Sequence, residues 1–74
     1  MAHYHYLIDH SRNLRRERQI GRYYVSDIAL ISVMRDLMDA RQKQRSEIAR
    51  AEIGREIDRV ETMLTSRRPV RTAI

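Results

Sequence analysis

The 74-residue chain contains no cysteine, tryptophan or phenylalanine, and it has only two glycines and one proline. Without cysteine, disulfide bonds and thiolate metal sites are excluded. The same absence fits a reducing compartment, so we expect a cytoplasmic protein. Few glycines and prolines mean few turns, and neither glycine lies in a phosphate-binding loop motif. With 34% charged residues, this composition is typical of an all-α protein.

A long apolar run is also missing. The most apolar segment, residues 28–34, is seven residues long and includes Ser32, whereas a membrane-spanning helix needs about 20. The N-terminus lacks the basic stretch and the long apolar run of a signal peptide, so we expect none. We also expect no membrane association. A chain of this length forms one domain with a small core, so a homodimer or docking on a larger molecule is the expected source of further stability.

Arginine is the residue in excess. It supplies 14 of the 15 basic residues, and the net charge of the chain is +5. The surplus lies at the ends, because residues 1–25 carry +3, residues 26–66 carry −1 and residues 67–74 carry +3. We therefore expect a single domain over residues 1–74, with a basic Tyr/His/Arg-rich N-terminal segment, a central folding unit and a basic C-terminal arm.

Two amphipathic patterns in the central unit predict two helices. The first covers about residues 26–42, with Ser26 as N-cap and a wide apolar face. The second covers about residues 46–66, where apolar residues recur three and four positions apart in a narrow, coiled-coil-like seam. The predicted packing residues are Ile28, Ile31, Met34, Leu37 and Met38 in the first helix and Ile53, Ile57, Val60 and Leu64 in the second.

The two patterns do not fit one straight helix. Extended backward, the second seam reaches Asp39, Arg35 and Ser32, which form the polar stripe of the first segment. A bend near residues 42–46 lets the two apolar faces meet, so we predict a helical hairpin. A continuous helix is the alternative, because this stretch has no glycine or proline. Either way, one partner helix cannot cover the first apolar face, which favours a dimer or docking on another protein.

The N-terminal segment is compatible with several structures. Residues 3–8 alternate His and Tyr before an apolar pair, which suits a short strand, an extended arm or the first turns of a helix. With Ser11 as N-cap, a short helix beginning at Arg12 and ending at residue 19 or 20, before Gly21, is a further expectation.

The sequence offers little evidence for a catalytic site or a metal site. His3 and His5 would face the same side of a strand, but nothing fixes a third ligand. The adjacent Asp9, His10 and Ser11 do not converge as a catalytic triad does. A two-helix chain of this size hardly builds a water-excluding pocket alone. We therefore predict a protein that is not an enzyme and holds no metal or cofactor.

Arginines interleaved with tyrosines near the ends are the candidate binding residues, because guanidinium groups pair with phosphate or carboxylate and tyrosine rings stack on bases. The plainer interpretation of the arginines is that they serve solubility and ion pairing throughout the chain and bind no partner. We predict a small regulatory or inhibitor-type protein that docks on a larger protein or ribonucleoprotein through an apolar helical face and Arg-rich ends. The alternative is RNA or DNA binding by residues 12–24 and 67–71. The predicted binding residues are Arg12, Arg15, Arg16, Arg18, Arg22, Tyr23, Tyr24, Arg67, Arg68 and Arg71.

Overall fold

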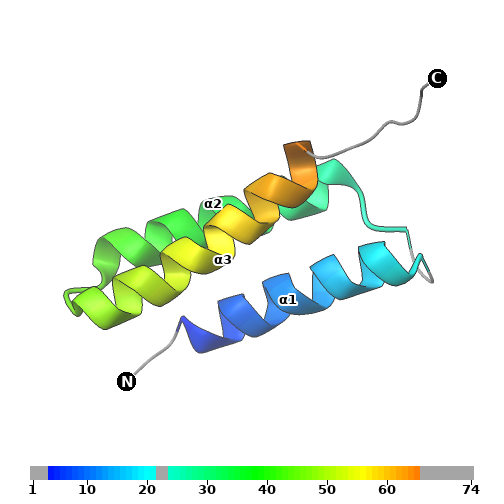
Figure 1. Cartoon of the computed structure of the whole chain (residues 1–74). Coiled ribbons are helices and arrows are strands. Elements are labelled where there is room, and N and C mark those ends of the chain that lie inside the picture. The colour runs from blue at the N-terminus through cyan, green and yellow to red at the C-terminus, as the bar shows by residue number, and fades with distance from the viewer. Residues whose placement is uncertain (1–3, 22–23, 66–74) are drawn as a thin grey trace.

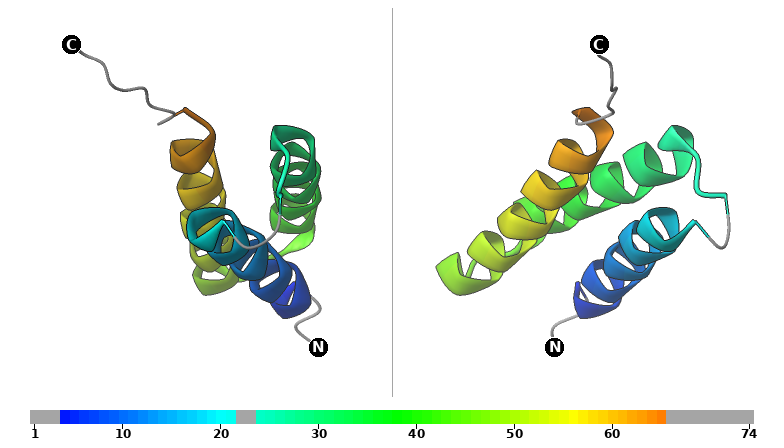
Figure 2. Two further views of the ribbon diagram at one scale, coloured as in Figure 1. Left: turned by 90° about the vertical axis from the view of Figure 1, so that its right-hand side faces the viewer. Right: turned by 45° about the vertical axis from the view of Figure 1, so that its right-hand side comes forward.

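The computed structural model describes residues 4–21 and 24–65, which form three helices and no strand. These are α1 (His5–Ile20), α2 (Asp27–Lys43) and α3 (Glu47–Thr65). In Figure 1, α2 runs antiparallel to α3, and α1 runs in the same direction as α3. Figure 2 shows α1 lying across one side of the α2–α3 pair. The predicted all-α fold and helical hairpin are confirmed, and the predicted hairpin helices agree with α2 and α3 to within a residue at each end.

The bend between α2 and α3 is made by capping rather than by glycine or proline. Gln44 ends α2, and its backbone N–H donates to the carbonyl oxygen of Arg41 at 3.2 Å. Ser46 Oγ then accepts the backbone N–H of Ala49 at 3.3 Å, just as Ser26 Oγ accepts that of Ala29 at 3.2 Å at the start of α2. Each serine satisfies one of the N–H groups that a helix start leaves unpaired. A continuous helix through residues 42–46 is therefore ruled out.

α1 begins earlier than the expected helix at Arg12. It starts at His5, with Tyr4 at the N-cap position, and ends at Ile20. Gly21 follows as the C-cap, and its φ of +79° provides the left-handed cap expected there. Ser11 is not an N-cap but a fully buried residue in the middle of the helix. The strand and extended arm are wrong for residues 5–8, because Tyr4, Leu7 and Ile8 pack against the hairpin and make a helical start favourable.

The core lies where the three helices meet. Buried Tyr4 of the α1 N-cap packs with α2 and α3 in a cluster comprising Tyr4, Leu37, Ala49, Ile53 and Ile57. Leu30, Val33 and Val60 are also buried. Of the remaining predicted packing residues, Met34 and Leu64 are half-buried. Among residues 4–21 and 24–65, no helix is both long enough and apolar enough to cross a membrane.

The expected packing side of α2 needs a correction. Ile28, Ile31 and Met38 are exposed, whereas Leu30 and Val33 are buried. The apolar face of α2 is wide, and the positions of α1 and α3 decide which part of it is covered. Both helices approach the side that carries Leu30, Val33 and Leu37, so the isoleucines on the other side stay in contact with solvent.

Candidate interaction surface

Arg15, one of the predicted binding residues, joins α1 to α3. Its Nε lies 2.8 Å from Oε2 of Glu56, and its Nη2 lies 3.0 Å from Oε1. Ser11 Oγ–H donates to the same Oε2 at 2.6 Å. The Glu56 side chain is only 1% exposed, and a carboxylate buried this deeply needs such partners to offset the loss of hydration. The Arg15 guanidinium is thus used inside the fold.

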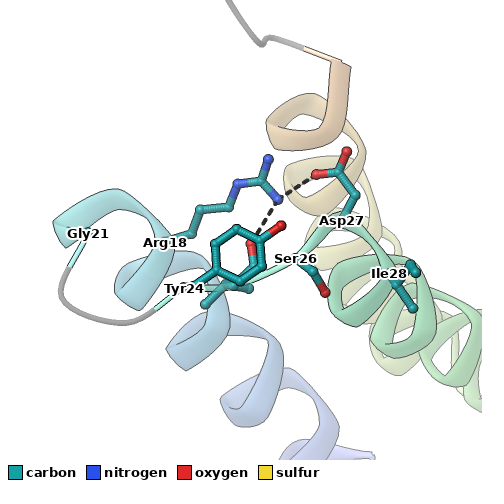
Figure 3. A pocket seen from close by; sticks show the side chains of 7 residues that line it. Arg18, Gly21, Tyr24, Ser26, Asp27 and Ile28 are labelled. Carbon is teal, nitrogen blue, oxygen red and sulfur yellow. Dashed lines mark hydrogen bonds and ion pairs between the residues drawn. The ribbon is translucent and has the colours of Figure 1, made fainter.

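Arg18 fastens the end of α1 to the start of α2. Its Nη1 lies 2.7 Å from Asp27 Oδ1 and donates to the carbonyl oxygen of Val25 at 3.4 Å. Figure 3 shows the guanidinium reaching over the connecting segment toward both groups. With the Ser26 cap, these contacts hold the backbone that carries Tyr24 and leads into α2.

Two apolar side chains beside this anchored segment are left bare. Tyr24 is 92% exposed and Ile28 is 78% exposed. They line an open hollow of about 650 Å³ whose other walls come from Arg18, the connecting segment and the first residue of α2 (Figure 3). Exposed apolar side chains that are grouped on one surface, rather than scattered singly, often mark a site where a partner or ligand binds.

A second, smaller hollow continues the surface along α2. It is lined by Ile28, Ile31, Ser32, Arg35 and Asp36, so Ile28 belongs to both hollows. We use the name junction surface for the exposed side chains of Tyr24, Ile28, Ile31 and Arg35. An aromatic ring and two isoleucines beside an arginine resemble the composition of protein–protein contact sites, in which Tyr and Arg are enriched.

The opposite end of the bundle is closed by a buried tyrosine. Tyr4 Oη–H donates to Oε1 of Glu52 at 2.6 Å, and His5 Nε2 lies 3.9 Å from the same oxygen. The hydrogen bond to the Glu52 carboxylate raises the pKa of Tyr4 above its ordinary value of 10.0, and burial and the nearby negative charge act in the same direction. The contact ties the start of α1 to α3.

The other predicted binding residues are not drawn together into one site. Arg12 is exposed, with Nη1 3.7 Å from Asp9 Oδ1, and Arg16 is exposed without a hydrogen bond or ion pair to the described residues. Tyr24 lies on the junction surface, and Arg18 lines the same hollow as Tyr24. Outside the described residues lie Arg22, Tyr23, Arg67, Arg68 and Arg71.

Ser11 and Glu56 are the structural residues that the sequence interpretation missed. Glu56 lies three residues after Ile53 and four before Val60, so helical spacing already placed it at the edge of the seam. Its burial was not visible from sequence, because it depends on α1 covering that edge.

The described part of the chain holds no group of three or more histidine, aspartate or glutamate side chains that could bind a metal ion. His3 of the metal hypothesis lies outside that part. Comparison with protein-family models, curated proteins and solved structures finds no match for the chain. We therefore infer its function from the geometry of the described surfaces.

Proposed function

We propose that this protein is a small, non-enzymatic binding module that docks on a larger protein through the junction surface. The exposure of Tyr24 and Ile28, which line the same hollow, is the observation that carries the proposal. Covering apolar surface is favourable by about 25 cal/mol per Å², so a partner that fills the hollow gains free energy from both side chains.

The local structure favours docking at this position. Arg18 holds the connecting segment through Asp27 and the Val25 carbonyl, and Ser26 caps the helix that presents Ile28. A surface that is ordered before the partner arrives loses less conformational entropy on binding. Arg35 adds a charged group at the rim, where it can select a partner by charge without the cost of full burial.

Ile48 provides a matched comparison. It is 76% exposed, yet it lies in the first turn of α3 at the other end of the hairpin and lines neither hollow of the junction surface. Single exposed apolar residues are common on protein surfaces and need no partner. The proposal therefore predicts different behaviour for Ile28 and Ile48, although both are isoleucines with similar exposure.

The first step of the test identifies the partner. A photo-crosslinking residue is introduced at position 28 or at position 48 in the native cell, and the lysate is treated with nuclease before adducts are compared. We expect one protein adduct that depends on position 28. Equal adducts at both positions, or an adduct removed by nuclease, would contradict the proposal.

The second step measures binding to the purified partner by calorimetry. Ile28→Ala and Tyr24→Ala should each weaken binding about tenfold or more, as truncation of a central contact does, whereas Ile48→Ala should stay within about twofold. Because the contact is mainly apolar, its affinity should change little between about 50 and 200 mM salt. Unchanged affinity in both junction variants would show that the partner docks elsewhere.

We propose further that the protein regulates or inhibits its partner by occupying a surface that the partner uses. A homodimer is the competing occupant of the junction surface. Sedimentation equilibrium separates the two: a dimer that Ile28→Asp converts to a monomer would assign the surface to a second copy and overturn docking on a larger protein.

A further inference from the structure

We propose that the turn between α2 and α3 is a second binding surface, which takes single-stranded nucleic acid. It lies at the opposite end of the hairpin from the junction surface, close to the start of α1 (Figure 1). Binding there goes beyond the proposed protein docking and does not depend on it. We use the name tip surface for Tyr6, Lys43, Gln44, Arg45 and Arg50.

Charge is unevenly distributed over the fold. Residues 41–50 carry four basic side chains and one acidic side chain, a net charge of +3. The other described residues carry seven basic and nine acidic side chains, a net charge of −2. Residues 12–18 carry the same excess, with four basic side chains and one acidic side chain. Arg15 and Arg18 of that segment are engaged in ion pairs within the fold, so the turn is the better candidate for a surface that attracts a polyanion.

The basic groups of the tip surface are available to a ligand. Arg45 is exposed and has no hydrogen bond or ion pair with the described residues. Arg50 is exposed, and its Nη1 makes only a long 3.4 Å hydrogen bond to the Gln44 carbonyl oxygen. Lys43 Nζ lies 3.1 Å from Asp39 Oδ2, but both side chains are largely exposed, and an exposed pair of this kind contributes little free energy and opens readily.

An aromatic ring lies next to one of these charges, that of Lys43. Tyr6 is 67% exposed and lines a hollow of about 450 Å³ together with Lys43 and Gln44. An exposed ring provides a face on which an unpaired base can stack, while neighbouring cations contact the phosphates. Asp36 and Asp39, which lie further from the turn along α2, also line the hollow. Their negative charges repel phosphate, so the favourable phosphate contacts are those at the turn itself.

This combination favours a single strand over an acidic protein. Stacking and phosphate pairing use the ring and the guanidinium groups together, whereas a carboxylate-rich peptide would use the charges and has no need of a bare ring. The tip surface also differs in location from the nucleic-acid site that the sequence offered as an alternative, which comprised residues 12–24 and 67–71. Within the first of these ranges, Arg15 and Arg18 are engaged inside the fold.

The test measures fluorescence anisotropy of a labelled 12-nucleotide oligouridine across a salt series. The tip variant is Lys43→Gln/Arg45→Gln/Arg50→Gln. The matched control is Arg12→Gln/Arg16→Gln/Arg55→Gln, which removes the same charge from exposed arginines elsewhere and leaves the C-terminal arginines in place. Circular dichroism verifies that both variants fold, and Arg45→Gln alone replaces the tip variant if it does not.

We expect the tip variant to bind at least tenfold more weakly at low salt. The slope of log Kd against log salt should fall by about 0.7 for each phosphate that the variant no longer neutralises. The control should keep most of the affinity and the wild-type slope. Tyr6→Ala should weaken binding about tenfold, and Tyr6→Phe should restore it, because stacking needs the ring and not the hydroxyl.

Three results would overturn the proposal. One is an equal reduction of affinity in the tip variant and the control, which would show a general charge effect. Another is full affinity in Tyr6→Ala together with equal binding of a duplex of the same length. The third is a poly-glutamate chain of equal charge that competes as well as the oligonucleotide, which would assign the tip surface to acidic proteins.

Discussion

The guanidinium of Arg15 in α1 and the carboxylate of Glu56 in α3 form a two-pronged ion pair, with N–O distances of 2.8 and 3.0 Å. The two residues are 41 positions apart in the chain. Their pairing, with the Ser11 hydroxyl, places a charged contact between α1 and α3 beside the apolar core. Buried pairs of this kind fix the register of the elements that they join, and here the pair sets the position of α1 on the hairpin.

Arg15→Gln should therefore destabilise the fold, whereas Arg16→Gln should not. Removal of the Arg15 guanidinium leaves the buried Glu56 carboxylate with the Ser11 hydroxyl and Arg59 Nη1, 3.9 Å from Oε1, as its partners among the described residues. The cost is about 3 kcal/mol, the lower end of the usual range, since these partners remain and Arg15 is itself 19% exposed. Arg16 is exposed, and its replacement should change the free energy of unfolding by less than about 0.5 kcal/mol. Urea denaturation followed by circular dichroism compares the two. Equal stabilities would mean that the pair does not hold α1.

Ile57→Asp should unfold the protein. The side chain is 5% exposed in the core cluster, and a carboxylate there would be buried without a partner in a domain whose whole stability is about 3–5 kcal/mol. Ile48→Asp is the control, because Ile48 is 76% exposed and its replacement buries no charge. Helix content by circular dichroism is the measurement. Unchanged helix content in Ile57→Asp would show that position 57 is not in the core.

Gly54→Ala should stabilise the protein. Gly54 lies inside α3, and an added Cβ would lie 3.7 Å from Arg41 Nη1, an ordinary contact distance. Alanine in a helix interior is favoured over glycine by about 0.8–1 kcal/mol, which raises Tm by roughly 4 °C or more in a domain of this size.

Gly21→Ala should have the opposite effect, although an added Cβ there would meet no atom within 4 Å. Its φ of +79° is left-handed, a conformation that costs a residue with a Cβ about 1 kcal/mol. Thermal unfolding of the two variants checks the pair. A change of the same sign in both would contradict the conformational explanation.

Tyr4 should make stability depend on alkaline pH. Because the hydrogen bond to Glu52 raises the folded-state pKa of Tyr4 above 10.0, its contribution is fully present below the unfolded-state pKa and is lost as pH rises through the folded-state pKa. The stability difference between the wild type and Tyr4→Phe should therefore shrink from about pH 9 to about pH 12. Tyrosinate absorbance and urea denaturation at each pH measure this. A difference that stays constant would show that the hydroxyl does not bond to Glu52 in solution.

The sequence by itself determined α2, α3 and the bend between them. Ser26 and Ser46 cap α2 and α3, and the spacing of Ile53, Ile57 and Val60 places one side of α3 in the core. These features depend on residues within a few positions of each other, and local hydrogen bonding and helical periodicity are sufficient to define them.

The tertiary structure alone decided which charged and apolar side chains are covered. Ser11 looked like a cap and Arg15 like a binding residue, yet both meet Glu56 inside the fold. Ile28 looked like a packing residue and remains exposed. The reason is physical: burial at these positions depends on the direction and register in which α1 lies on the hairpin, and these come from contacts between residues more than 40 positions apart. No local pattern in the chain carries that information.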